Sequence, residues 1–415
     1  MIVIKESLPL EILSLLNAEE LAVRTFSTNQ FIAYLDFDEC FSLDKKETKS
    51  CLSKLENSCE FYDLSFSGWV GFFGYEFLAA NLGLLLESDC DLDIEDGWFG
   101  RPQTIIHFRN EETRIESIIP NREEELSKQL KIDQLKIKGT QDFSHSSLRC
   151  NLSYDQYEKI FHKAKEAILD GESYQIKISQ RYEAKAKIDP VIAFNKLYKA
   201  NPAPQAFLLK TNSFSIISCS PEIVVQKTEN QITTRPIGGT YERFKGESRN
   251  SVIQKFLSDE KEVAEHNMLV DLERNDLSTI CSPGTVRLSR FREVETYSHL
   301  HHLVSTIEGR LRNNLKLSDI IAAMLPGGSI TGCPKLRTMV WIDSLEPCFR
   351  GPYTGSFGLI GDNGDLSLNI IIRSMLTLGN YCYIQSGGGI VINSNPEYEF
   401  NENQLKAKAL LELLS

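Results

Sequence analysis

The sequence lacks long apolar runs, paired cysteines and the start of a secreted protein. No stretch of about 18 apolar residues occurs, so we expect no membrane-spanning helix. Met1–Leu16 has neither the basic start, the long apolar run nor the small-residue cleavage site of a signal peptide. The ten cysteines are irregularly spaced and form no Cys-x-x-Cys pair, which favours reduced thiols over a disulfide framework or a zinc site. We therefore expect a cytoplasmic protein.

The chain also lacks an excess of basic residues. Its 415 residues carry a formal net charge of −12, which argues against non-specific binding to nucleic acid. With 41% hydrophobic and 25% charged residues, the composition is that of an ordinary globular protein that can bury one large core or two or three smaller ones. If the ligand is an anion, the site must oppose this negative charge with a metal ion, Arg, Lys or backbone N–H groups.

A glycine-rich segment, Met324–Lys335, leads into a predicted helix over 334–345. Gly327 and Gly332 have the spacing of a phosphate-binding loop, but Cys-Pro follows where Lys-Ser/Thr is required. Backbone N–H groups at the start of a helix attract anions. The segment therefore suggests an anionic ligand and argues against a nucleotide.

The pattern of residues divides the chain into three parts. Residues 1–135 mix short strand-like runs with acidic loops, residues 136–150 form a polar connector, and residues 151–415 form the largest part. Many strands separated by a few long helices predict an α+β fold. Helices are predicted over 153–171, about 252–272, 334–345 and 397–414. Strands are predicted over 68–76, 173–182, 206–210, 214–218, 223–227, 355–360, 366–373 and 381–385.

Several carboxylates have the spacing of a possible metal site. Glu265 lies well inside a predicted helix, and Glu399 and Glu402 share a face of the last helix because they are three residues apart. Carboxylates from separate helices could hold Mg²⁺, a hard cation that prefers oxygen ligands. Solvated helix glutamates are the alternative on spacing alone.

Three other features suit an anionic ligand, each with a structural alternative. Gly387–Gly389 follows a predicted strand and could bring backbone N–H groups close to a carboxylate, or form a flexible turn. Arg373 ends a strand of apolar residues and could bind a carboxylate or form a structural ion pair. His302 is either a polar group of the site or a satisfied core histidine.

Taken together, these segments resemble the chorismate-using enzymes, specifically the large subunits of anthranilate synthase and aminodeoxychorismate synthase. The resemblance covers roughly residues 150–412, and the order and spacing of the motifs agree throughout. The matching segments are Gly171–Gln175, Ser220–Glu222, Arg235–Thr240, Asp259–Glu262, Glu265–Asp276, His302–Ser305, Pro326–Lys335, Gly387–Gly389 and Pro396–Glu399.

The resemblance implies roles for the acidic residues. Glu265 and Glu402 would hold Mg²⁺, with Glu399 close by, and the metal ion would bind the ring carboxylate of chorismate. Glu222 would be a general acid near the C4 hydroxyl group, a role that requires a raised pKa, which burial would supply.

The resemblance also implies how the rest of the substrate is held. Arg373 and Tyr353 would bind the enolpyruvyl carboxylate, together with the backbone N–H groups of Gly387, Gly388 and Gly389.

Further residues complete the implied pocket. Ser329, Lys406 and His302 line it in relatives, and Thr240, the last residue of its motif, joins the catalytic candidates. The implied fold is the α+β chorismate-enzyme architecture, a β-sandwich of large sheets flanked by helices, with the N-terminal region intertwined.

Gln175 separates two branches of the family. In the isochorismate and salicylate synthases this position is a lysine that activates water, whereas a glutamine has no titratable amine and cannot act as that base. The resemblance therefore implies ammonia as the final nucleophile. Because no glutamine-hydrolysing region is recognisable, the ammonia would come from a separate glutamine amidotransferase subunit or from ammonium in solution.

Different motifs favour different products of the reaction. Ser329–Gly332 resembles the aminodeoxychorismate branch, and the Leu-Leu-Glu-Ser element of anthranilate synthases has its nearest counterpart, Leu84–Ser88, later than expected. Against this, many aminodeoxychorismate synthases carry a reactive lysine where this chain has Gly238. Alternation places Lys177 on the same strand face as Gln175, and Lys177 stands where relatives commonly have Asn. It is either an amine of the pocket, as nucleophile or as charge, or an exposed strand lysine.

We therefore expect component I of an aminodeoxychorismate synthase, which aminates chorismate to 4-amino-4-deoxychorismate with Mg²⁺ and ammonia. Component I of an anthranilate synthase is the first alternative. A non-catalytic chorismate-binding subunit is the second.

Overall fold

The computed structural model describes residues 1–6, 8–16, 18–27, 30–57, 61–88, 90–132, 148–244, 246, 248–296 and 300–414. Residues 136–147 of the predicted connector lie outside this set. Within it, none of the helices combines the length and apolar character needed to cross a membrane, and the cysteines are free thiols.

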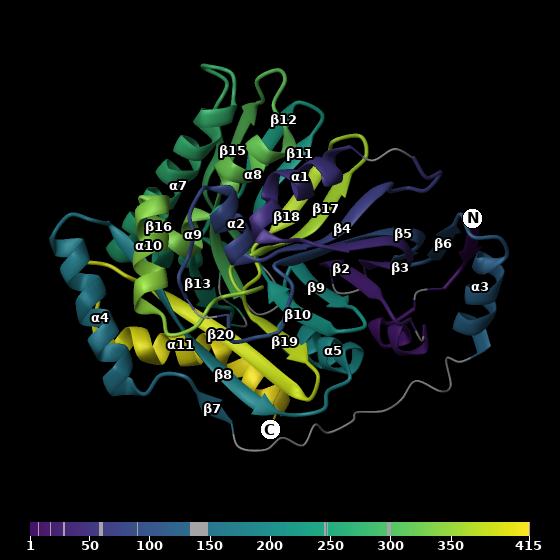
Figure 1. Ribbon diagram of the computed structural model, residues 1–415, viewed down its shortest axis with the longest axis horizontal. Helices are drawn as coiled ribbons and strands as arrows, with labels where there is room; N and C mark the ends of the chain where they lie inside the picture. Colours follow the sequence, from purple (N-terminus) through teal and green to yellow (C-terminus); the bar gives the residue numbers. More distant parts are fainter. Residues whose placement is uncertain are drawn as a thin grey trace.

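The strands are joined by antiparallel pairing into one continuous network (Figure 1). From β8 the neighbours run in the order β20, β19, β10, β9, β2, β3, β5, β4, β17, β18, β11, β12, β15 and β14. The strands are β1 Ile2–Ile4, β2 Leu21–Ser27, β3 Gln30–Ser42, β4 Gly68–Phe73, β5 Gly97–Phe108, β6 Thr113–Ser117, β7 Arg149–Cys150, β8 Gln175–Lys185, β9 Gln205–Lys210, β10 Phe214–Ser220, β11 Ile223–Thr228, β12 Gln231–Thr234, β13 Ile237–Glu242, β14 Arg287–Thr296, β15 Leu300–Arg310, β16 Gly332–Cys333, β17 Ser356–Gly361, β18 Leu366–Asn369, β19 Ser374–Leu378 and β20 Tyr381–Ile390.

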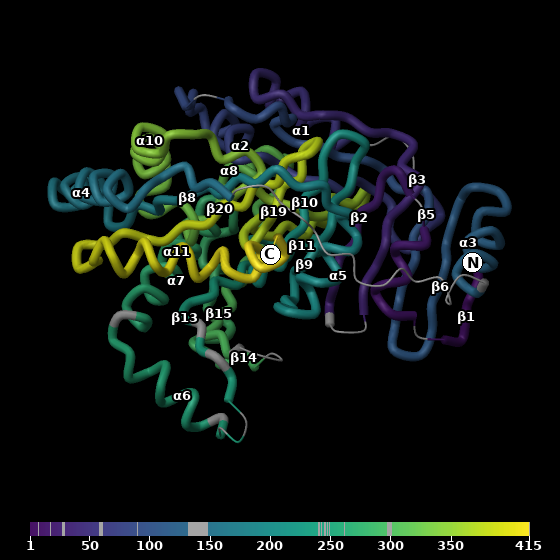
Figure 2. The backbone as a smooth tube through the Cα atoms, turned by 90° about the horizontal axis from the view of Figure 1, so that it is seen from below, coloured from purple at the N-terminus to yellow at the C-terminus, as the bar shows by residue number. Residues whose placement is uncertain are grey.

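Helices flank this network of strands. In the residues described they are η1 Leu10–Leu15, η2 Lys45–Glu47, α1 Thr48–Glu56, α2 Tyr75–Asn81, α3 Arg122–Ile132, α4 Tyr154–Leu169, α5 Pro190–Ala200, α6 Arg249–Ser258, α7 Glu260–Ile280, α8 Leu317–Met324, α9 Gly328–Thr331, α10 Lys335–Leu345, α11 Pro396–Leu411 and η4 Glu412–Leu414. Helix α11 packs along β20, α10 packs on β8, and α7 packs across β13 and β15. Figure 2 shows α6 projecting from the body beside β13 and β14.

Strands of the N-terminal region lie in the middle of the network. β2 pairs with β9, and β4 pairs with β17, so both edges of the N-terminal sheet continue into strands from the rest of the chain. This interleaving is the arrangement expected from the sequence motifs, and the mixed α+β class is confirmed.

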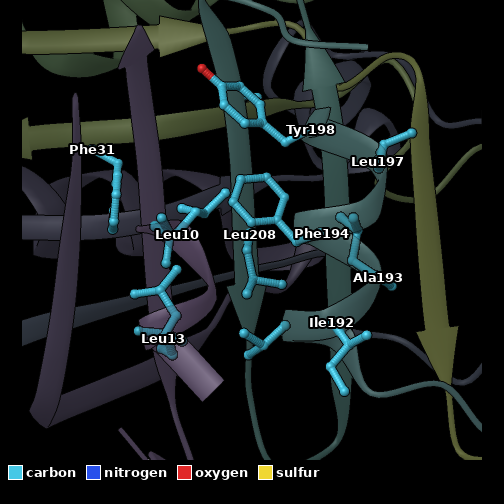
Figure 3. Close-up of a cluster of buried hydrophobic side chains, with 14 of the residues drawn as sticks. Leu10, Leu13, Phe31, Ile192, Ala193, Phe194, Leu197, Tyr198 and Leu208 are labelled. Atoms are coloured by element: carbon cyan, nitrogen blue, oxygen red, sulfur yellow. The ribbon is translucent and has the colours of Figure 1, made fainter. Parts of the chain in front are cut away.

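One buried apolar cluster ties the N-terminal region to the rest (Figure 3). Leu10 and Leu13 of η1 and Phe31 of β3 pack with Phe194 of α5 and Leu208 of β9. Full burial of such a side chain stabilises the fold by about 1.5–3 kcal/mol.

Local signals in the sequence predicted some boundaries well. Ser153 caps α4 in a reciprocal capping box with Gln156, and Gly171 has a φ of +78° just after that helix ends. The helix predicted over 252–272 is wrong in detail, because it is two helices that meet at Asp259. The Asp259 side chain accepts a hydrogen bond from the Glu262 N–H and so starts α7.

Candidate active site

Strands β8 and β20 form the base of the candidate site. Gly387, Gly388 and Gly389 pair with Ser179, Ile178 and Lys177, so the three glycines lie inside β20. The alternative of a flexible turn is therefore wrong. A Cβ atom on Gly387 would lie 2.8 Å from the carbonyl oxygen of Ile178, which precedes its strand partner Ser179, too close for any side chain.

Gln175 and Lys177 both lie over Gly389. A Cβ atom on Gly389 would come within 2.8 Å of Gln175 Cδ and 2.9 Å of Lys177 Nζ. Gln175 is buried, and Lys177 is partly buried, so the alternative of an exposed strand lysine is wrong. Burial lowers the pKa of Lys177, as does the charge of Lys406.

Three carboxyl groups from two helices act on the charge of this amine. Glu265 of α7 and Glu402 and Glu399 of α11 each raise the pKa of Lys177 and so oppose the effect of burial. Glu399 is buried and accepts a hydrogen bond of 2.8 Å from Ser394 Oγ. Residues of α7 and α11 thus both act on the charge of Lys177, and the predicted meeting of Glu265 and Glu402 around a metal ion stays a prediction.

The three glutamates offer carboxylate oxygens, the type of ligand that Mg²⁺ prefers. Within the residues described, no set of three His, Cys, Asp or Glu side chains stands close enough together to hold a metal ion. Proteins usually bind Mg²⁺ through one or two carboxylates, with water and substrate oxygens as the remaining ligands. Glu265, Glu399 and Glu402 would supply such oxygens, and Mg²⁺ at this place remains a proposal.

Lys406 connects α11 with the base of the site. Its Nζ lies 3.0 Å from Glu402 Oε1 and donates a 3.3 Å hydrogen bond to the carbonyl oxygen of Gly387. Lys406 is thus close to the predicted glycines, although its side chain is exposed.

Glu222 is a buried acid between β10 and β11. Ser329 Oγ of α9 donates a hydrogen bond of 3.1 Å to Glu222 Oε1. Burial raises the pKa of Glu222 to about 7, although the Ser329 bond and the charges of Lys177 and Arg373 lower it. The carboxyl group is therefore protonated in a substantial fraction near neutral pH.

Arg373 acts on the charge of this acid, and His302 is in turn influenced by Arg373. Arg373 does not end a strand as predicted, because β18 stops at Asn369 and Arg373 stands in the connection to β19 with a φ of +49°. Burial lowers the pKa of its guanidinium group, and Glu222 raises it. His302 of β15 is buried, and burial together with the Arg373 charge lowers its pKa to about 4, so its ring is neutral at pH 7.

Tyr353 lies beside Arg350, and Thr240 is described through its backbone alone. The ring of Tyr353 lies 5.7 Å from Arg350 Cζ, and its pKa is raised by burial and Glu346 and lowered by Arg350. Tyr353 also lines a cavity of about 20 Å³ with Ser374, the residue after Arg373. Thr240 is described through its backbone, which pairs with His302, and its side chain lies outside the described atoms.

Position 238 has no room for a lysine as the protein stands. A Cβ atom on Gly238 would lie 2.6 Å from Cβ and 2.7 Å from Cγ of His266. His266 is held by a contact of 2.6 Å between its Nε2 and Ser305 Oγ. The ring of His266 thus occupies the space that a side chain at position 238 would need.

A second buried acid, Glu273, escaped the sequence reasoning. Thr234 Oγ1 donates a hydrogen bond of 2.9 Å to Glu273 Oε2. Burial raises the pKa of Glu273 to about 8, and the charges of Asp276 and Glu222 raise it further. Glu273 follows Glu265 by eight residues, slightly more than two helical turns, so its place on the inner face of α7 was available from the pattern.

An ion pair behind the site was also missed. Arg350 Nη2 lies 2.8 Å from Glu346 Oε1 and donates a 2.9 Å hydrogen bond to the carbonyl oxygen of Lys177. Glu346 accepts further hydrogen bonds from the N–H and the hydroxyl group of Ser179. These bonds fix the backbone of β8 on both sides of Ile178, and nothing in the sequence signals a contact over such separations.

Comparison with known proteins shows the family to which this chain belongs. The family model for chorismate binding enzymes matches residues 18–412, and the chain belongs to this family. It is 45% identical over 248 residues to anthranilate synthase component 1 1 of Haloarcula marismortui, covering 60% of this chain and 51% of that protein. It is 42% identical over 257 residues to aminodeoxychorismate synthase component 1 of Bacillus subtilis, covering 62% and 55%. The chain thus spans about half the length of these curated relatives.

The solved structures confirm the architecture. Anthranilate synthase component I of Streptococcus pneumoniae TIGR4 superimposes with a TM-score of 0.74 and 29% identity, covering 93% of this chain and 89% of that one. The fold and the family model thus agree that the chain belongs to the chorismate binding enzymes, and its relatives include both kinds of component 1.

Proposed function

We propose that the chain is component I of an aminodeoxychorismate synthase, which replaces the C4 hydroxyl group of chorismate with an amino group. The observation that carries this proposal is the buried Glu222, bonded to Ser329, with a pKa raised to about 7. A hydroxyl group leaves readily only when it is protonated, and a carboxyl group with a pKa near the working pH is suited to give that proton.

The charges around Glu222 suit a substrate with two carboxylates. In the proposal Arg373 binds the enolpyruvyl carboxylate with Tyr353 and the backbone of Gly387–Gly389. Mg²⁺, when bound by Glu265 and Glu402 with Glu399 close by, would supply positive charge to the ring carboxylate. Charges held in place before the reaction cost no reorganisation during it.

The bonds and protons of the proposed amination can all be accounted for with the groups named above. The C4–O bond breaks as Glu222 gives its proton to the oxygen, and water leaves. Ammonia forms the C4–N bond and then loses a proton, which restores protonated Glu222. Chorismate and ammonia thus become 4-amino-4-deoxychorismate and water.

Gln175 supports ammonia as the nucleophile. Its Oε1 is buried and has no hydrogen-bond partner among the residues described, and its Cδ would lie 2.8 Å from a Cβ atom on Gly389 at the base of the site. A buried acceptor of this kind suits a donor such as ammonia, and an amide cannot deprotonate water. We propose that a separate glutamine amidotransferase subunit supplies the ammonia.

Component I of an anthranilate synthase is the second candidate. The relative from Haloarcula marismortui carries that name at 45% identity, and no lysine stands at position 238, where His266 fills the space. In this reading ammonia enters at C2 and pyruvate is lost.

Product identification separates the candidates. The protein is incubated with chorismate, ammonium and Mg²⁺, and the products are separated by chromatography with mass detection. We expect 4-amino-4-deoxychorismate, which an added lyase converts to p-aminobenzoate. Accumulation of anthranilate without a lyase would overturn the C4 assignment, and chorismate that binds but is not consumed would indicate a non-catalytic subunit.

A further inference from the structure

Arg350 is a buried arginine whose side chain binds several separate segments around the candidate site. Its Nε and Nη2 atoms donate hydrogen bonds of 2.9 Å and 2.8 Å to the carboxylate of Glu346. Nη2 also donates a bond of 2.9 Å to the carbonyl oxygen of Lys177, and Nη1 donates bonds of 3.3 Å to the carbonyl oxygen of Ile330 and to Thr354 Oγ1. A guanidinium group has five N–H donors, and these bonds use all of them.

One of these bonds reaches the short helix that carries Ser329. Helix α9 spans only Gly328–Thr331, and no side chain caps its N-terminus. A helix of this length is not stable by itself, so contacts from other segments determine where its side chains lie. Arg350 supplies such a contact at Ile330, the residue after Ser329, whose hydroxyl group donates the 3.1 Å bond to Glu222.

The N-terminal region holds Arg350 from the other side. Glu76 of α2 accepts hydrogen bonds of 2.8 Å from the Arg350 N–H and 2.9 Å from the Gly351 N–H. The Tyr75 N–H donates a bond of 2.8 Å to the carbonyl oxygen of Gly351, and the Tyr75 ring lies 4.9 Å from Arg350 Cζ. The backbone and the side chain of Arg350 are therefore both fixed by contacts within the chain.

We propose that Arg350 is a positioning residue of the active site, which holds Ile330 and so keeps the hydroxyl group of Ser329 within hydrogen-bond distance of Glu222. Its effect on this acid is indirect and passes through Ser329. The inference rests on the proposed function, which makes Glu222 the acid of the reaction.

The first test follows the protonation of Glu222 in the full chain by infrared spectroscopy. The probe is the carboxyl band that Glu222→Gln removes, and in the unmodified protein it should disappear as pH rises through about 7. Ser329→Ala should move this titration upward by about half a unit to one unit, because a bond to the charged form is lost. Arg350→Lys keeps the positive charge beside Glu346 but has three donors in place of five, so Ser329 loses its fixed place and the titration should move upward by a similar amount.

A double variant separates positioning from a general loss of stability. If Arg350 acts through Ser329, the combination of Ser329→Ala with Arg350→Lys should titrate as Ser329→Ala alone does. A shift that adds to that of Ser329→Ala would mean that Arg350 acts by another route, and would overturn the inference. Other charged groups act on Glu222 and are the same in all of these variants, namely Lys177, Arg373 and Glu273.

A second variant keeps the test decisive if Arg350→Lys does not fold. Arg350→Met combined with Glu346→Gln removes both charges of the buried pair, so neither charge is left without its partner. Ile330 again loses its donor, and the titration of Glu222 should again move upward. Circular dichroism checks that each variant is folded.

Two controls match these substitutions. Arg101 lies on β5, is as buried as Arg350 and forms an ion pair of 2.8 Å with Asp362, so Arg101→Lys controls for the loss of a buried arginine. Tyr75→Phe keeps the ring beside Arg350 and removes a buried hydroxyl group that has no hydrogen-bond partner among the residues described. Both variants should titrate as the unmodified protein does, whatever their stability.

The outcomes separate this inference from the proposed function. If Ser329→Ala moves the titration and neither variant of Arg350 does, the positioning role is rejected and the acid of the proposed function stands. If Glu222→Gln removes no titrating band, or Ser329→Ala leaves the titration in place, the account of Glu222 in the proposed function fails, and the inference fails with it.

Discussion

Ser329 donates a hydrogen bond of 3.1 Å to the buried carboxyl oxygen Oε1 of Glu222 and so joins the glycine-rich segment to the acid of the site. Two effects on Glu222 oppose each other at this contact. Burial raises the pKa to about 7, whereas the hydroxyl donor lowers it because it stabilises the charged carboxylate. Their balance determines the pH at which the acid is protonated.

Ser329→Ala should move the pH profile to higher values. Loss of the donor raises the pKa of Glu222, by about half a unit to one unit for a single hydrogen bond to a charged group. Protonated Glu222 is the proposed active form, so kcat/KM for chorismate should fall as pH rises through about 7 in the unmodified protein, and at a higher pH in the variant. Ser258→Ala, an exposed serine of α6, is the control. A profile that does not move contradicts this account.

Glu222→Gln should remove the proton donor and keep the shape of the side chain. The amide oxygen can still accept the bond from Ser329, so chorismate should bind within a few-fold of the normal affinity. The rate of amination should fall by about 10²- to 10⁴-fold, the usual contribution of a general acid. Calorimetry gives the affinity and chromatography the rate. A variant that aminates at the normal rate would show that another group protonates the leaving hydroxyl.

The sequence predicted elements whose signals are local. Ser153 and Gly171 mark the ends of α4 within a few residues of the chain, and the structure confirms both. Apolar periodicity runs on through Asp259, so the pattern alone did not separate α6 from α7. For the three glycines of β20 the sequence left open a carboxylate-binding segment or a flexible turn, because a glycine run is flexible in isolation. Their place inside a strand is decided by the pairing with β8, just over two hundred residues earlier.

The site needed tertiary information that no local pattern carries. Strand alternation placed Lys177 on the face of Gln175, but it does not say which face of β8 is covered. That depends on how the helices pack on the strands, such as α11 along β20 and α10 on β8. The φ of +49° at Arg373 likewise depends on how β18 leads into β19, and an arginine rarely adopts this conformation.

Gly238→Ala should destabilise the protein. The added Cβ atom would lie 2.6 Å from Cβ of His266, so either the ring or β13 must shift. Overpacking of this kind costs about 1–3 kcal/mol of unfolding free energy, measured by urea denaturation. Gly327→Ala is the matched control, since its nearest neighbours would be 3.5 Å away, an ordinary contact distance, and its φ is −61°. Equal stability of the two variants would mean that His266 moves aside without cost.

Glu273→Gln should change how stability depends on pH. Burial, together with Asp276 and Glu222, raises the pKa of Glu273 to about 8 in the folded protein, against about 4.3 in an unfolded chain. The folded state therefore holds this proton more tightly. The stability that Glu273 contributes is fully present below about pH 4.3 and is lost as pH rises through about 8.

The variant should escape this loss, because glutamine is neutral at every pH. Between about pH 5 and 8 the unfolding free energy of the unmodified protein should fall relative to that of Glu273→Gln, by on the order of 1.4 kcal/mol for each unit of pKa difference. Glu166→Gln, an exposed residue of α4, is the control and should follow the unmodified protein. Parallel curves for Glu273→Gln and the unmodified protein would mean that Glu273 is ionised in the fold. The bond from Thr234 and the nearby charge of Lys335 would then outweigh its burial.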